Sequence, residues 1–469
     1  MSFVQPSWFA YLALLLWPIV TLFLYAKLPT GRATIWTVLG AFLLLPTGTI
    51  IKFGGVPGLD KESIPNFAAL IGCAFCTGRL PRFFRGLGLI EVLFCLLLVG
   101  PFITSMLNTD PVRAGAIILP GIGGYEALSV AVSQFIMIIP FFLGRQFLRN
   151  SQDNADILRI LTIAGLAYSL PMLFEVRMSP QLSSWIYGYV PTSLVTALRD
   201  GGFRPVVFLM NGLWVAFFAM TTTVAAAAMW RTRISFGRLQ PNWITYYLSF
   251  VLVLCKTESA LLYGIIVVPL VRWAGPRVQL RVACILVTVA LAYPLLRVAD
   301  LVPTTSLLEM TNELSPGHLG SLKVRLEQEY QLLEHAWERP WFGWGRFGRG
   351  RIYDEAGSDI TISDGYWVIT VGTFGLVGFF AQFGMLGLPV FRAARAHRVA
   401  STQQEAVYLG ALSLIVAINM IDLLPNSSLS PWTWLLAGAL LGRAEQLSAV
   451  RSPKFSAQET RLLLSRPTA

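Results

Sequence analysis

Long apolar runs, separated by short polar segments, recur along almost the whole chain. About 20 apolar residues are needed to cross the hydrocarbon of a bilayer, and in lipid a run of this length satisfies its backbone groups as a helix. The pattern predicts about thirteen transmembrane helices, or twelve because the third and last runs are short. They are expected near residues 8–26, 33–51, 66–80, 87–106, 127–144, 157–175, 206–230, 241–256, 259–272, 281–299, 365–391, 406–424 and 431–442.

Small arginine clusters in the short loops orient these helices. The clusters fall on alternate loops, and the C-terminal tail falls on the same side. Since Lys and Arg accumulate in cytoplasmic loops, that side is expected to be the cytoplasm and the N-terminus to be outside. The clusters are Arg79 to Arg85, Arg145 with Arg149, Arg231 to Arg238, Arg272 to Arg281 and Arg392 to Arg398.

Composition supports the same fold class. The 469 residues are 55% hydrophobic and 13% charged, whereas soluble domains are about 25% charged. The net charge of +11 is dispersed in the loops, which favours topology signals and contact with anionic lipid over nucleic-acid binding. The five cysteines lie in or beside apolar runs, so no disulfide framework is expected. The sequence therefore predicts an all-α polytopic membrane protein with the lipid bilayer as its first partner.

The predicted helices leave one large extracytoplasmic loop, before the third-last helix. We expect an N-terminal helix bundle over 1–299, the loop over 300–364, C-terminal helices over 365–442 and a disordered cytoplasmic tail over 443–469. Long loops cross the membrane largely regardless of their charge. The basic residues of this loop therefore do not report topology, and they are candidates for binding an anion.

An amphipathic helix is predicted within the loop, over 321–337. Apolar residues recur there at spacings of three and four, which is one face of an α-helix. Arg325 and Glu329 lie one turn apart on a neighbouring, more polar face. Such a helix lies on the membrane surface or caps a cavity. The apolar positions are Leu322, Leu326, Tyr330, Leu333 and Trp337.

A turn rich in glycine and arginine, WFGWGRFGRGR, follows Pro340. Glycines let the backbone approach a ligand, and guanidinium groups bind phosphate bidentately. Arg346, Arg349 and Arg351 are therefore candidates for binding a diphosphate. The alternative interpretation is a solvated loop, or one that contacts lipid headgroups.

Asp364 stands directly before the next apolar run. A carboxylate in this position has two interpretations. It can be an N-cap that accepts backbone N–H bonds, or a general base with access to substrate at the membrane surface. The sequence leaves both open.

These motifs, in this order, resemble the O-antigen ligase and polymerase superfamily of bacterial polysaccharide assembly. Members carry a late periplasmic loop with an arginine on a loop helix, a phrase like Pro-Leu-Phe-Gly-hydrophobic-Gly, a His-Asn-x-Tyr-Leu motif and Gly-Leu-x-Gly in the next helix. Arg325 matches the loop arginine, residues 340–345 (PWFGWG) match the second motif and 375–378 (GLVG) match the last. The resemblance covers roughly residues 240–440.

Two positions depart from the family's pattern. Asp364 stands where the family has its histidine, so the resemblance implies that Asp364, or else His318 or His335, acts as base. The family also has a basic residue after an earlier helix, where this chain has Glu258 with Lys256 two residues before it. Lys256 is either a substitute for that charge or a lysine whose side chain reaches the membrane interface.

The resemblance implies a membrane-embedded, inverting glycosyltransferase of the C class that needs no metal and no cofactor. Asp364 and Arg325 would be catalytic, and Lys256, Arg346, Arg349 and Arg351 would bind the diphosphate of an undecaprenyl-diphosphate-linked glycan. We expect a polymerase at the periplasmic face of the bacterial inner membrane, with a flippase and a chain-length regulator as further partners. An O-antigen ligase is the alternative within the family, and a flippase or other transporter is the alternative outside it.

Overall fold

The computed structural model describes residues 6–52, 57–78, 80–192, 194–199, 201–304, 309, 319–361, 364–400 and 402–450. In these ranges each of the thirteen predicted spans coincides with a helix. The helices are α1 (Trp8–Lys27), α2 (Thr30–Leu44), α3 (Ser63–Thr77), α4 (Leu89–Met106), α5 (Gly124–Phe147), α6 (Ser151–Met178), α9 (Gly212–Thr232), α10 (Pro241–Leu254), α11 (Glu258–Trp273), α12 (Pro276–Val298), α15 (Tyr366–Ala396), α16 (Gln403–Asp422) and α17 (Pro431–Val450). The predictions made for Arg79, His318 and residues 451–469 lie outside the described residues.

The helices confirm an all-α, multi-pass membrane protein. Among the described residues, eight helices are long and apolar enough to cross a bilayer: α1, α4, α5, α6, α9, α12, α15 and α16. The shorter helices α2, α3 and α10 are also apolar. Two of the predicted spans, 33–51 and 66–80, thus correspond to short helices of 15 residues each.

Helix ends follow ordinary capping chemistry. Asn211 begins α9 because its Oδ1 accepts hydrogen bonds from the backbone N–H groups of Leu213 and Trp214, at 3.0 and 3.2 Å. Thr402 does the same for α16 through the N–H of Glu405. Such caps satisfy N–H groups that have no partner within the helix.

The C-terminal boundary at 442 was predicted too early, because α17 continues to Val450. Buried ion pairs hold this extension against the other helices. Arg443 pairs with Glu405 of α16. Glu445 pairs with Arg145 of α5, at 2.6 Å, and Arg145 also pairs with Glu91 of α4, at 2.9 Å.

Helix α17 crosses α5 at very close range, and glycine makes this possible. A Cβ on Gly438 would lie 1.9 Å from the carbonyl oxygen of Phe141, and one on Gly442 would lie 2.3 Å from that of Arg145. Small residues allow such backbone approach between membrane helices. The same crossing forms much of the buried core.

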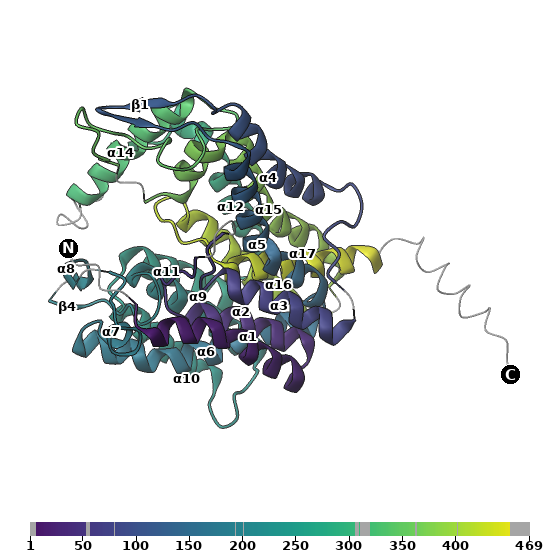
Figure 1. The fold of residues 1–469 in the computed structure, drawn as a ribbon. Helices are drawn as coiled ribbons and strands as arrows, with labels where there is room; N and C mark the ends of the chain where they lie inside the picture. Colours follow the sequence, from purple (N-terminus) through teal and green to yellow (C-terminus); the bar gives the residue numbers. More distant parts are fainter. Residues whose placement is uncertain are drawn as a thin grey trace, which may run out of the picture.

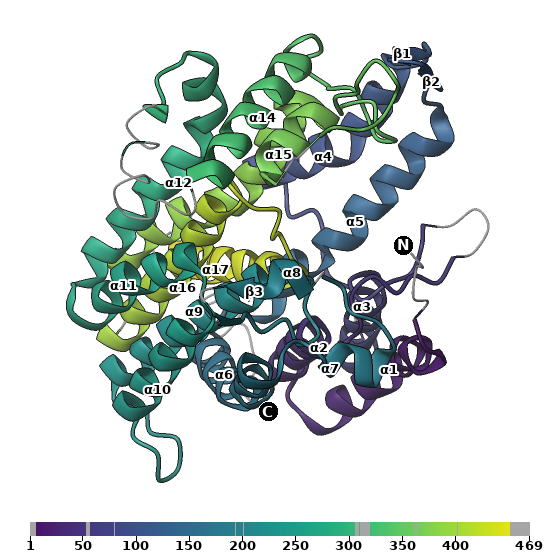
Figure 2. The ribbon, with the colours of Figure 1, turned by 90° about the vertical axis from the view of Figure 1, so that its left-hand side faces the viewer.

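The loops that the sequence predicts to be extracytoplasmic gather at one end of the molecule. In Figure 1, α14, α8 and β4 lie toward the left, while the end of α17 lies toward the right. Figure 2 faces that end and shows α14 beside α15, with the β1–β2 hairpin near α4 and α5. The loop elements are β1 (Val112–Ala114), β2 (Ile117–Leu119), α7 (Leu182–Tyr187), α8 (Leu194–Ala197), β3 (Leu198–Arg199), β4 (Gly202–Phe203) and α14 (Leu319–Trp337).

Candidate functional site

The loop helix α14 forms where the amphipathic pattern predicts it, but the face that it buries differs in part from the predicted apolar face. Tyr330 and Trp337, expected on the apolar face, are 58% and 39% exposed. Leu333 is buried as predicted, and Leu332 and Ala336 are buried beside it. Of the other predicted positions, Leu326 is half-buried and the side chain of Leu322 lies outside the described residues.

The contacts of Glu329 explain why α14 buries this face against α12 and α15. Oε1 of Glu329 accepts hydrogen bonds from Arg297 Nε at 2.9 Å and from the Tyr293 hydroxyl at 3.1 Å, both on α12. Oε2 accepts one from Trp367 Nε1 of α15, at 3.3 Å. Burial raises the pKa of Glu329, and the adjacent Arg297 opposes that shift. Sequence reasoning missed this role, since nothing local signals a partner 32 residues earlier.

One helical turn away, Arg325 meets Asp364. Arg325 Nη2 lies 2.9 Å from Asp364 Oδ2, and the two side chains are 37% and 44% exposed. An exposed pair of this kind contributes about 0–1 kcal/mol to stability. The structure therefore brings together the two residues predicted to be catalytic, at a site open to solvent, where the pair has little value for folding alone.

Asp364 does not cap α15. The cap position is Gly365, and carbonyl groups of the loop between α16 and α17 accept from the first N–H groups: Asn426 O from Tyr366 N at 3.2 Å, and Leu423 O from Trp367 N at 3.4 Å. The N-cap interpretation of Asp364 is wrong because a distant loop supplies these acceptors. Its role as base stays a prediction.

The two glycine motifs of the resemblance bind one another through backbone hydrogen bonds. Residues 340–345 lie along a break in α15, where Gly375 has φ 67° and ψ −172°. Trp344 N donates to Gly372 O at 2.8 Å, and Leu376 N donates to Pro340 O at 2.7 Å. Further bonds join Gly345 N to Thr373 O and Val377 N to Trp341 O. The loop thus replaces hydrogen bonds that the broken helix cannot make.

Arg349 anchors the loop instead of projecting from it. Its side chain is 0% exposed, and Nη1 donates to the carbonyl oxygens of Asp110 and Pro120 at 2.8 and 2.9 Å. The buried Asn108 nearby accepts from Arg339 Nη1 at 2.7 Å. These bonds tie the glycine and arginine turn to the β1–β2 hairpin. They occupy the Arg349 guanidinium, which was predicted to bind diphosphate.

Arg346 and Arg351 face open space instead. Both line a cavity of about 470 Å³ beside the first turns of α15, together with Thr361, Tyr366 and Thr370. Arg346 is exposed, and Arg351 pairs with Asp359. Asp364 lies in the chain between two lining residues, Thr361 and Tyr366. Of the three arginines predicted in the turn, Arg346 is thus exposed at this cavity, Arg351 lines it while paired with Asp359, and Arg349 is buried.

Lys256 lies with a different loop. It joins α10 to α11 with φ 48°, and its Nζ donates to the carbonyl oxygen of Arg199 in β3, at 3.1 Å. Arg204 reaches the neighbouring Thr257. The described contact of Lys256 is therefore with the loop before α9, and its predicted role in binding diphosphate stays a prediction.

His335, the alternative base within the described residues, is engaged on both ring nitrogens. Nε2 lies 3.1 Å from Arg349 O and Nδ1 lies 3.3 Å from Glu338 Oε1. Its ring stacks on Trp344 with centroids 4.5 Å apart. This arrangement packs the turn against α14.

Within the described ranges, no group of three or more His, Cys, Asp or Glu side chains is placed to hold a metal ion. Comparison with known proteins matches the chain to no family model and to no curated protein. The assignment of a function therefore depends on the site itself and on the resemblance carried by its motifs.

Proposed function

We propose that the protein is a glycosyltransferase of the bacterial inner membrane. It polymerises undecaprenyl-diphosphate-linked oligosaccharide repeat units into a surface polysaccharide at the periplasmic face. The observation that carries the proposal is the contact between Arg325 and Asp364, 2.9 Å apart, next to a cavity lined by Arg346 and Arg351. All four of these residues belong to the one large loop before α15.

The chemistry of transfer needs these groups. When a sugar leaves a diphosphate, negative charge develops on the departing oxygen. Fixed guanidinium groups stabilise that charge without reorganising. Arg325 is the fixed group here, because Asp364 holds it and α14 is anchored by Glu329. The apolar exterior of the helices keeps the lipid tail in the bilayer while the diphosphate reaches the loop.

Transport is less well supported by the same features. Transporters carry polar residues within their spans and often use broken helices to expose backbone groups to substrate. Here the break in α15 is filled by residues 340–345. The membrane carboxylates Glu91 and Glu175 are also engaged, by Arg145 and by the backbone N–H groups of Leu182, Val206 and Val207.

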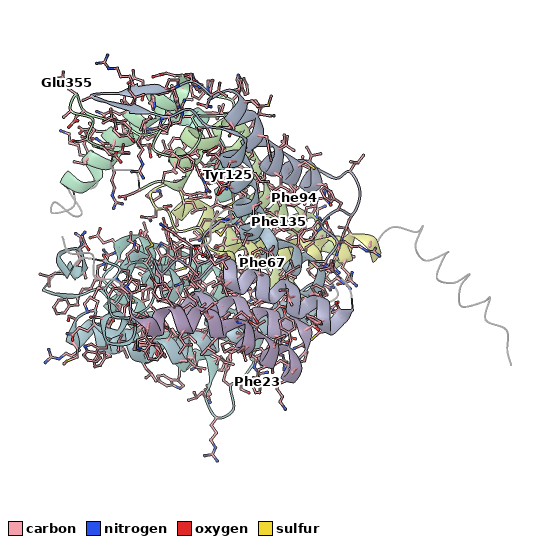
Figure 3. The ribbon with its side chains drawn as sticks, viewed as in Figure 1. Phe23, Phe67, Phe94, Tyr125, Phe135 and Glu355 are labelled. Atoms are coloured by element: carbon pink, nitrogen blue, oxygen red, sulfur yellow. The ribbon has the colours of Figure 1, made fainter. Side chains whose placement is uncertain are left out.

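The first test replaces Asp364 by Asn. We expect this variant to insert normally and to lose polymer by about 100-fold or more, the scale of losing one fixed electrostatic contact to the transition state, because Asp364 no longer holds Arg325. The measurement is a gel of surface polysaccharide from a deletion strain that carries each variant. Glu355→Gln is the matched control, since Glu355 is exposed and lies at the outer edge of the loop in Figure 3.

Normal polymer from the Asp364→Asn strain would remove Asp364 from the mechanism. The same gels separate the activities. A deletion strain with single-repeat chains indicates a polymerase, whereas free, unligated glycan indicates a ligase. A transporter predicts lipid-linked units that accumulate on the cytoplasmic leaflet in the deletion strain.

A further inference from the structure

A second cavity, of about 340 Å³, lies on the other side of Arg346. It is bounded by the loop before α3 and by α5, α15 and α17. Arg346 and Tyr366 line both this cavity and the one beside Arg351. The new cavity adds polar groups that the loop does not supply: Asp60 and Glu62 before α3, Gln134 of α5 and Gln382 of α15.

Three consecutive charged residues at this cavity have three different environments. Asp60 lies three residues before the first residue of α3, and its Oδ1 accepts hydrogen bonds from Ser63 N and Oγ, both at 2.9 Å. Lys61 points elsewhere, since its Nζ donates to Thr47 Oγ1 at 2.8 Å and to Phe208 O at 3.1 Å. Glu62 lines the cavity, and its carboxylate makes no hydrogen bond or ion pair within the part of the chain that the structure describes.

The cavity also holds a polar atom without a partner. Gln134 is 6% exposed, and its Oε1 accepts no hydrogen bond from the described residues. A buried carbonyl oxygen without a donor destabilises the protein, so a ligand that supplies a donor is favoured here. Gln382 Oε1, by contrast, already accepts from the Tyr366 hydroxyl at 3.2 Å.

Carboxylate, amide and aromatic groups around one space are the chemistry that recognises hydroxyl groups. We propose that this cavity binds the acceptor sugar and that Glu62 is the base that deprotonates its attacking hydroxyl. The proposal rests on the proposed glycosyl transfer and deepens it. It leaves Asp364 as the residue that positions Arg325, since its carboxylate already binds that guanidinium.

The transfer then balances as a single displacement. The acceptor O–H gives its proton to Glu62 while its oxygen forms a bond to the anomeric carbon of the donor. The bond between that carbon and the diphosphate oxygen breaks, and the electron pair leaves with the lipid diphosphate. Arg346 lines both cavities, so it lies between the proton acceptor and the leaving group. Water later takes the proton from Glu62.

The pKa of Glu62 suits the role of a general base. Burial first, and then the charge of Asp60, raise the pKa of Glu62 to about 7, and Lys61 opposes the shift. The charged or titratable groups that line the same cavity are Asp60, Arg346 and Tyr366; α4, α5 and α17 contribute none. A base with a pKa near the operating pH is the most effective proton acceptor.

The experiment compares Glu62→Gln, Asp364→Asn and Glu355→Gln as purified proteins in lipid nanodiscs. The substrate is the lipid-linked repeat unit extracted from the deletion strain, and undecaprenyl diphosphate is the binding probe. We expect Glu62→Gln to lower kcat about 100-fold or more and to bind undecaprenyl diphosphate as the wild type does. Asp364→Asn should weaken that binding, because Arg325 loses its partner.

The pH profile identifies the base. Wild-type kcat should fall as the pH drops below about 7, because Glu62 is then protonated. Glu62→Gln should lose this dependence and Asp364→Asn should keep it. Added formate should restore part of the activity of Glu62→Ala, since it replaces the missing carboxylate.

Other results would contradict the role of Glu62 or the proposed function. A wild-type kcat in Glu62→Gln overturns the role of Glu62. The role is also overturned if Asp364→Asn, and not Glu62→Gln, loses the fall of kcat at low pH. Either result leaves glycosyl transfer intact. Loss of undecaprenyl diphosphate binding in Glu62→Gln also overturns the role of Glu62. A wild-type protein that transfers no sugar overturns the proposed function and the base together.

Discussion

At the scale of single residues, the Glu329 carboxylate holds helix α14 in place, and α14 carries Arg325, which we propose stabilises the diphosphate of the donor. Glu329 binds Arg297, and Arg325 lies one turn before it on α14. The Glu329 and Arg297 side chains are 13% and 6% exposed. Removing one partner of a buried pair leaves the other charge without compensation, which costs far more than the pair contributes.

We therefore expect Glu329→Gln to lower stability by about 3–5 kcal/mol and to raise the donor KM through the altered position of α14. Thermal unfolding in detergent and steady-state kinetics measure the two effects. Glu327→Gln is the matched control on the same helix, because Glu327 and its partner Lys323 are 59% and 63% exposed. Equal Tm values for the two variants would contradict this account.

At the scale of elements, the break in α15 decides how the loop docks. Gly375 has a backbone conformation that only glycine adopts readily, and a Cβ there would lie 2.2 Å from the backbone of Trp341. Gly343 lies in the loop that docks here, and a Cβ added to it would lie only 2.6 Å from the backbone of Thr373 in α15. Each glycine permits the backbone bonds between 340–345 and α15.

Gly375→Ala should therefore separate the loop from α15. The strained backbone alone costs about 1–3 kcal/mol, and the overlap with Trp341 adds to it. Limited proteolysis of the loop over 338–365 measures the change, and cleavage should be faster in the variant. Gly100→Ala on α4 is the control, because nothing lies within 4 Å of its added Cβ. Cleavage at the wild-type rate in Gly375→Ala would show that the docking survives.

At the scale of the whole molecule, the arginine clusters and the order of the helices predict the same orientation in the membrane. The described arginine clusters lie at loops opposite to the one that carries Arg325 and Asp364. The loop before α3, with Glu62, is on the same side as Asp364 by this alternation. Both cavities are therefore expected to open to the extracytoplasmic face.

Cysteine labelling tests this orientation. In spheroplasts, an impermeant maleimide should label Glu355→Cys at once and Arg238→Cys only after permeabilisation, since Arg238 belongs to the loop between α9 and α10. The five native cysteines are replaced beforehand. Labelling in the reverse order would invert the topology and remove the periplasmic site.

The sequence by itself determined the helices, the fold class and the choice of Arg325 and Asp364 as candidates, whereas the contact between them was decided by the structure. Hydrophobic runs of this length have one stable solution in lipid, so their pattern alone predicts helices at thirteen places. The family order of motifs brought Arg325 and Asp364 together as candidates, and both lie in one loop, 39 residues apart.

Tertiary structure alone decided what surrounds that contact. Arg349 was predicted to bind an anion but is buried on the carbonyl groups of Asp110 and Pro120, more than 200 residues earlier. The two glycine motifs pair with each other, and Glu62 shares a cavity with Arg346. Local patterns carry no information on contacts this distant, because packing between helices, not the neighbouring residues, determines which side chains meet.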